Sequence, residues 1–126
     1  MRDALSAAGL TAGNIDYINL HGTATPSNDR AEGHAVNAVF GARVPCSSTK
    51  GATGHTLGAA GALEAVICAL SIEHGFIPGG IQAENVDPEL RVNYVTRTRT
   101  ATPSAVMTNS FGFGGTNCSL VLGRAG

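Results

Sequence analysis

The sequence predicts an α/β fold with a mixed β-sheet and covering helices, and three observations carry this prediction. Apolar, β-branched runs of strand length alternate with segments of helical pattern, which is typical of a sheet covered by helices. The last two such runs, residues 105–109 and 118–122, are joined by a short glycine-rich turn and should pair antiparallel, which makes the sheet mixed. A length of 126 residues fits one domain with a modest core.

The first half of the chain is expected to contain two helices and two strands, in the order helix 3–8, strand 15–20, helix 29–40 and strand 44–48. The first strand is apolar and β-branched, as a buried strand should be. A loop over residues 23–28 precedes the second helix, and Ser27 or Asn28 can cap it. Asp29 and Glu32 fall in its first turn, where carboxylates favour the helix dipole.

The second half is expected to run through a turn 51–54, a helix 55–73, a loop 75–91, an edge strand 94–100 and the two final strands. The long helix is apolar nearly all round, so it should be central in the fold. Its stretch 56–72 is apolar enough to raise the question of a membrane span. Because it contains Glu64 and is short for a bilayer, a buried helix is favoured. Arg97 and Arg99 of the edge strand should face water.

The composition of the chain limits which partners and which cellular environment are expected for it. Apolar residues make up 43% and charged residues 13%, so a missing domain or second subunit is expected to cover much of the surface. The net charge of −1 leaves no broad basic face for nucleic acid. No signal peptide is visible, and a cytoplasmic, membrane-free protein is expected. The spacing of Cys46, Cys68 and Cys118 fits neither a disulfide framework nor a zinc site, so all three are interpreted as buried packing residues.

Three segments with chemically active side chains lie at predicted strand ends: HGTATP over residues 21–26, STKGATGH over residues 48–55 and NSFGFGGTN over residues 109–117. Functional groups of α/β sheets gather where strands end and loops begin. Two histidines and a lysine on such loops indicate acid–base chemistry or stabilisation of an oxyanion. His34 and His74 lie on or just past surface helices and are assigned no role. The glycine spacing fits neither GxGxxG nor a P-loop.

Taken together, HGTxTP, STKxxTGHxLGAAGxxE and NSFGFGGTN resemble the C-terminal half of the β-ketoacyl-acyl-carrier-protein synthases, the elongating condensing enzymes of fatty acid and polyketide synthesis. The resemblance covers essentially the whole chain. It implies the thiolase fold, usually as a dimer, and a decarboxylative Claisen condensation without a cofactor. In that reaction the carbanion from malonyl-acyl-carrier protein attacks an acyl thioester on a cysteine.

The resemblance also implies roles for individual residues. His21 and His55 would be the catalytic histidines, whose N–H groups stabilise the malonyl enolate. The Phe113 N–H would complete an oxyanion hole for the acyl thioester. The remaining site residues would gate the acyl pocket (Phe111 with the Phe113 ring), bind the phosphopantetheine arm (Thr23, Thr25) or support the site (Lys50, Glu64, Asp29, Asn109). A buried carboxylate needs a partner, so Glu64 is expected to pair with Lys50.

A structural monovalent cation, found in some members, would lie near Asn19, Glu64, Thr108 and Asn109. No other metal is expected.

The sequence departs from the family in two places. Nothing reproduces the strand-to-helix turn that carries the nucleophilic cysteine, so residues 1–126 are interpreted as the C-terminal domain of a synthase, truncated at its N-terminal end. This fragment should be inactive alone. Its partners would be the missing N-terminal half, acyl carrier protein and a second subunit in a homodimer or heterodimer. The loop Pro78-Gly79-Gly80-Ile81-Gln82 also departs from the usual Pro-Pro-Thr-x-Asn pattern.

Three alternatives stay open. The first is a non-catalytic partner like the chain-length factors, against which the retained His21, Lys50 and His55 argue. The second is a synthase domain of a modular polyketide enzyme, where glycine more often stands at the position of Ala24. The third is an unrelated α/β binding module.

Overall fold

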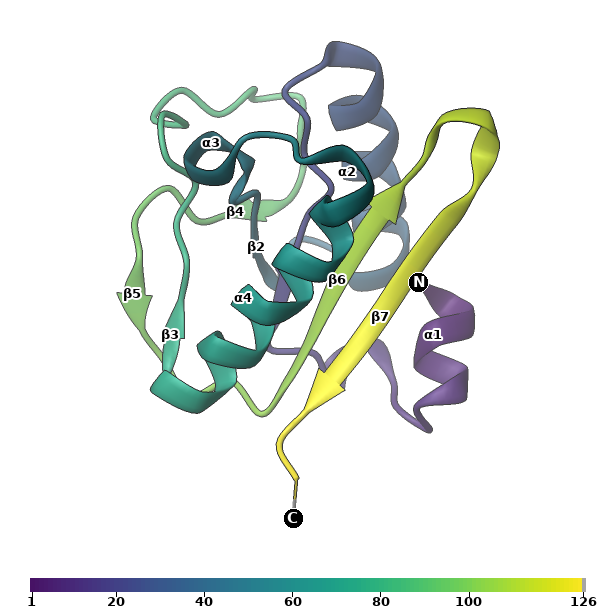
Figure 1. Cartoon of the computed structure of the whole chain (residues 1–126), viewed down its shortest axis with the longest axis vertical. Coiled ribbons are helices and arrows are strands. Elements are labelled where there is room, and N and C mark those ends of the chain that lie inside the picture. The colour runs from purple at the N-terminus through teal and green to yellow at the C-terminus, as the bar shows by residue number, and fades with distance from the viewer. Residues whose placement is uncertain (126) are drawn as a thin grey trace.

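The computed structural model describes residues 1–125, in which helices and strands alternate in the first half and strands follow one another after residue 75 (Figure 1). The helices are α1 (Arg2–Ala7), α2 (Pro26–Phe40), α3 (Lys50–Thr53) and α4 (Ala60–His74), with 3₁₀ turns η1 (Ala12–Asn14), η2 (Leu57–Ala59) and η3 (Phe113–Gly115). The strands are β1 (Tyr17–Asn19), β2 (Pro45–Ser47), β3 (Phe76–Ile77), β4 (Asn93–Tyr94), β5 (Arg99–Thr100), β6 (Ala105–Phe111) and β7 (Asn117–Gly123).

The main sheet has five strands in the order β4-β2-β1-β6-β7. Strands β4, β2, β1 and β6 are parallel, whereas β7 returns antiparallel to β6 as a hairpin. The predicted mixed sheet and its antiparallel hairpin are therefore confirmed. Strands β3 and β5 form a separate antiparallel pair.

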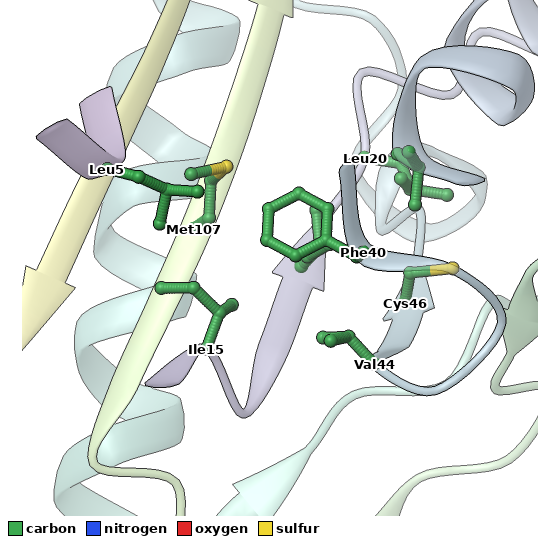
Figure 2. Packing of buried hydrophobic residues seen from close by; sticks show 9 residues of the cluster. Leu5, Ile15, Leu20, Phe40, Val44, Cys46 and Met107 are labelled. Carbon is green, nitrogen blue, oxygen red and sulfur yellow. The ribbon is translucent and has the colours of Figure 1, made fainter. Parts of the chain in front are cut away.

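Helices cover both faces of this sheet, and each face has its own core. On one face α1 and α2 bury Leu5 and Phe40 against Ile15 and Met107, as Figure 2 shows. On the other face α4 buries Cys68 and Ile72 against alternate residues of the same strands. Because successive side chains of a strand point to opposite faces, short strands serve both cores.

Three boundaries differ from the prediction. Helix α2 begins at Pro26 with Thr25 as N-cap, because proline at the first helical position loses no hydrogen bond. Helix α4 begins at Ala60, which leaves His55 in the loop before it. The expected strand 94–100 is divided between β4 and β5, although Arg97 and Arg99 are exposed as expected.

Residues 50–53, expected mostly in a turn, form one helical turn, which Gly54 ends with a φ of 71°.

Two burial predictions were wrong. Cys118 is exposed because it lies near the start of the edge strand β7, where Leu120 on the same face is also 46% exposed. Helix α4, which was expected to be central in the fold, buries only one stripe, including Glu64 and Cys68. On its other side Val66 is 55% exposed and Leu70 is 38% exposed. Within the described residues nothing covers that second stripe. The stretch Leu57–His74 is apolar enough to cross a membrane by length and composition, a test that core helices also pass.

Candidate functional site

His21 and His55 converge at the carboxyl edge of the parallel strands. His21 follows β1, and His55 lies between α3 and η2, so only the fold brings them together. Their ring centroids are 5.4 Å apart and the ring planes are nearly perpendicular. The ring of Phe111, at the end of β6, lies 5.7 Å from that of His21. One small region therefore contains two imidazoles beside an aromatic wall.

The buried carboxylate of Glu32 fixes the backbone at His21. Its two oxygens accept the N–H groups of His21 and Gly22, each at 2.9 Å, and Oε1 also accepts from the Asn109 amide at 3.2 Å. Burial raises the pKa of Glu32, and the Gly22 and His21 N–H groups oppose that rise. Three donors aimed at one carboxylate hold the loop after β1 to helix α2.

The His21 imidazole is held neutral. Its side chain is buried, and this burial, followed by the nearby Lys50 and His55 charges, lowers its pKa to about 4. The Asp29 carboxylate acts in the opposite direction but does not outweigh them. At neutral pH one ring nitrogen of His21 therefore carries a proton and the other carries a lone pair.

The His55 tautomer follows from its local backbone. The N–H of Leu57 points at Nδ1 of His55 at 3.3 Å, so Nδ1 is the acceptor and the proton of the neutral ring is on Nε2. Leu57 has a φ of 52°, a left-handed conformation that is costly for leucine. His55 is exposed, so its Nε2–H is available to a bound molecule.

Lys50 and Glu64 form the predicted ion pair, in which the Lys50 ammonium donates to Oε1 of Glu64. Lys50 is 8% exposed and Glu64 only 1%. Burial raises the pKa of Glu64, and the Lys50 ammonium opposes that rise. The prediction that Glu64 is buried with Lys50 as its partner is confirmed.

The other carboxylate oxygen of Glu64 is part of a group of buried oxygens without a hydrogen-bond partner. Oδ1 of Asn19 and Oγ1 of Thr108 share this property, and the two residues are paired on β1 and β6. Amide, hydroxyl and carboxylate oxygens are ligands that hard cations prefer. Three of the four predicted cation residues therefore fit, whereas Asn109 already bonds Glu32 and Ser119. In residues 1–125 no metal-type cluster of histidine, cysteine or acidic residues occurs.

The remaining predicted residues lie on loops and in the first turn of α2 and have fewer contacts. The hydroxyls of Thr23 and Thr25 are 2.8 Å apart on the loop between β1 and α2. Phe113, in the β6–β7 turn, is 98% exposed, so its ring is not packed against the histidine pair. Asp29 lies in the first turn of α2.

Sequence reasoning missed two residues that hold the site together. Glu32 was interpreted only as a helix-dipole residue, and Ser48 was given no role. For Glu32 a signal existed, because it shares the spacing of Val36 and Phe40 on the buried stripe of α2. A charge on such a stripe needs an interior partner. The contacts of Ser48 depend on the pairing of two distant loops, which no local pattern reveals.

A cavity of about 300 Å³ lies behind the His21 loop, between α2 and the segment 81–94. Gly22, Ala24, Ser48 and Tyr94 are among its lining residues, and neither histidine is. The cavity therefore adjoins the backbone of the candidate site and not its reactive side chains.

Comparisons with known families, curated proteins and solved structures all match this chain to β-ketoacyl synthases. The model of the family described as "Beta-ketoacyl synthase, C-terminal domain" matches residues 1–84. The 3-oxoacyl-[acyl-carrier-protein] synthase 2 of Coxiella burnetii is 46% identical over 98% of this chain, and synthase 1 of Escherichia coli K12 is 50% identical over 86%. The solved ishigamide ketosynthase/chain length factor superposes with a TM-score of 0.96 at 42% identity over 99% of the chain. The chain spans 31%, 27% and 32% of these three proteins.

Proposed function

The chain belongs to the β-ketoacyl synthase family and has its thiolase-like fold, and from this premise we propose that it supplies the histidine and lysine part of a condensing site. The reaction would be the decarboxylative Claisen condensation of malonyl-acyl-carrier protein with an enzyme-bound acyl thioester, in fatty acid or polyketide biosynthesis. The observation that carries this proposal is the convergence of His21 and His55, with ring centroids 5.4 Å apart.

Stabilisation of an enolate is the chemistry that this pair performs best. When malonate loses carbon dioxide, negative charge develops on the thioester oxygen, and fixed N–H donors stabilise it. His55 offers Nε2–H because Leu57 occupies Nδ1, and His21 is neutral because burial and Lys50 depress its pKa. Two N–H donors at one oxygen would stabilise the developing charge.

The surrounding groups would bind and orient the substrate. The paired hydroxyls of Thr23 and Thr25 would hydrogen-bond the phosphopantetheine arm. Phe111 would form the wall of the acyl pocket beside His21, and the Phe113 N–H would complete the oxyanion hole for the acyl thioester. Asp29 and Asn109 would support the His21 loop from α2 and β6.

Asn19, Glu64 and Thr108 would hold a monovalent cation through their unpartnered oxygens. A cation at this place would give Oε2 of Glu64 a partner, because Lys50 bonds only Oε1. With Lys50 it would keep α4, which follows His55, fixed against β1 and β6.

Cys46 and Cys68 are buried in β2 and α4, and Cys118 lies on the edge strand β7, so none of them stands on a strand-to-helix turn like that of the family's nucleophile. The acylated cysteine would come from the N-terminal half of the family's proteins. Burial raises the pKa of Cys46 and of Cys68 to about 12, which suppresses the reactive thiolate. The exposed apolar stripe of α4, including Val66 and Leu70, supports a covering partner of this kind. The chain alone should therefore lack condensing activity.

A second candidate is a subunit like the chain length factors, because one matching structure is described as a ketosynthase/chain length factor. The retained histidine pair and the Lys50–Glu64 pair favour the enzyme.

The deciding experiment incubates acyl- and malonyl-acyl-carrier protein with the intact protein that contains this chain, and separately with the chain alone. We expect a β-ketoacyl product from the first incubation and none from the second. A protein that stabilises a partner synthase but makes no product would favour the chain-length-factor role. Product formation by the chain alone would contradict the assignment of the nucleophile to the other half.

A further inference from the structure

Ser48 joins the loop that carries His21 to the turn that carries Lys50. It lies between β2 and α3, and its hydroxyl donates to the carbonyl oxygen of Gly22 at 2.7 Å. The same hydroxyl accepts from the backbone N–H of Lys50 at 3.3 Å. The Ser48 side chain thus connects Gly22, the residue after His21, to the backbone of Lys50.

Packing makes this connection tight. Gly22 has a φ of 37°, and a Cβ atom there would lie 2.4 Å from Cβ of Ser48. Its N–H is bonded to Glu32 and its C=O to Ser48, so both sides of Gly22 are fixed. His21 precedes Gly22 directly, so the position of its ring depends on these two bonds.

Tyr94 holds Ser48 in turn. The backbone N–H of Ser48 donates to the Tyr94 hydroxyl at 3.2 Å. The Tyr94 ring occupies the space that a side chain at position 80 would need, since a Cβ on Gly80 would lie 2.3 Å from the hydroxyl oxygen. This contact explains how the unusual Gly79-Gly80 pair fits the fold: position 80 carries no side chain and Tyr94 fills the gap.

A cavity lies behind the His21 loop, so the loss of these bonds would allow the loop to move. Gly22, Ser48 and Tyr94 all line its 300 Å³, so the loop has space to relax if the bonds are lost. A displacement of about 1 Å in a catalytic group is enough to lower a rate by roughly 100-fold.

We propose that Ser48, held by Tyr94, is a positioning residue that sets the place of His21 relative to Lys50 for the decarboxylation step. The proposal rests on the proposed function for its catalytic readout. Its physical consequence for His21 does not depend on that function.

That consequence is a displacement of the His21 ring. In the wild-type chain its centroid lies 5.4 Å from that of the His55 ring and 5.7 Å from that of the Phe111 ring. If the bonds of Ser48 are lost and the loop relaxes into the cavity, the His21 ring should move by about 1 Å relative to both.

The chain contains a matched control. Ser47, the last residue of β2, directly precedes Ser48 and is buried. Its hydroxyl bonds the Tyr17 hydroxyl at 2.8 Å and donates to the carbonyl oxygen of Pro78 at 2.6 Å. Both serines contact a tyrosine hydroxyl, Ser48 through its backbone N–H and Ser47 through its hydroxyl, but only Ser48 bonds the His21 loop. The variants Ser48→Ala and Tyr94→Phe are compared with Ser47→Ala and Tyr17→Phe in the intact synthase.

Two readouts are measured: kcat and KM for malonyl-acyl-carrier-protein decarboxylation, and the position of the His21 ring in crystal structures of the variants. We expect Ser48→Ala to lower kcat by about 10- to 100-fold with KM changed less than about twofold. The His21 ring should move by about 1 Å relative to the rings of His55 and Phe111. Tyr94→Phe should act in the same direction more weakly, and both controls should leave kcat and the ring position unchanged.

Equal loss of kcat in Ser48→Ala and Ser47→Ala, or an unmoved His21 ring in a folded Ser48→Ala protein, would overturn the proposal. If Ser48→Ala does not fold, Tyr94→Phe decides by the same two criteria. A wild-type synthase without decarboxylase activity would refute the proposed function, while the position of the His21 ring would still decide the role of Ser48.

Discussion

The Lys50 ammonium and the Glu64 carboxylate pair with each other at a place where both side chains are almost completely buried. Removing one partner of a buried pair leaves an uncompensated charge, which costs about 3–5 kcal/mol. We expect Glu64→Ala to lower the free energy of unfolding by this amount in urea titrations. Glu73→Ala, on the exposed side of the same helix, is the control and should change it by less than about 0.5 kcal/mol. Equal effects of the two variants would contradict the account.

The unpartnered oxygens of Asn19, Glu64 and Thr108 predict a salt-specific stability. A cation that binds only the folded protein raises its melting temperature by mass action. We expect sodium or potassium chloride to raise Tm above that in choline chloride at the same ionic strength. Thr108→Val removes one oxygen and should abolish the difference. The same Tm in all three salts would refute the cation site.

Asp16 should make part of the stability depend on pH. Burial alone would raise its pKa, but the N–H and hydroxyl of Ser104 and the N–H of Ala105 outweigh burial and hold the pKa below its ordinary value. A carboxyl with a lowered folded-state pKa stabilises the fold above its unfolded pKa of about 4, and this contribution is lost as pH falls through the folded value. Asp16→Asn should therefore destabilise at pH 7 and make little difference near pH 2.

Urea titrations of wild type and Asp16→Asn at several pH values measure this difference. Asp3→Asn, on the exposed α1, is the control. A gap between wild type and Asp16→Asn that stays constant from pH 7 to pH 2 would rule out the hydrogen-bonded carboxylate as its source.

Ala24 has a φ of 59°, a left-handed conformation that costs a residue with a Cβ about 1–2 kcal/mol. Ala24→Gly relieves this strain but increases the entropy of the unfolded chain, so the net gain should be roughly 0.5–1 kcal/mol. Ala31→Gly, on an exposed position within α2, should instead destabilise by about 1 kcal/mol. Thermal melts of both variants check the opposite signs, and a loss of Tm in Ala24→Gly would refute the strain at this position.

Much of this arrangement could be predicted from sequence. His21 directly follows one apolar strand-like run, and the segment 48–55 with Lys50 and His55 follows the next. This order predicts a cluster at one edge of a sheet, and the structure brings His21 and His55 together there. The solitary charge of Glu64 in an apolar helix predicts a buried partner, which is Lys50. Both predictions rest on the cost of burying polar groups, and that cost can be read from sequence.

Other features depend on contacts between distant segments. The start of α4 at Ala60 follows from the left-handed backbone of Gly54 and Leu57, and leucine gives no sign of such a conformation in sequence. The exposure of Cys118 depends on the position of β7 at the edge of the sheet and on which segments pack against it. Such outcomes are decided by tertiary packing, which overrides local preference.

The most direct test of the central claim separates the two half-reactions in the intact synthase that contains this chain. Variants His21→Ala, His55→Ala and the double variant are assayed for decarboxylation of malonyl-acyl-carrier protein and for loading of an acyl group onto the nucleophilic cysteine. Because only decarboxylation forms an enolate, each single variant should lose roughly 100-fold or more in that step and much less in loading. A double variant that still decarboxylates malonyl-acyl-carrier protein at the wild-type rate would contradict the account.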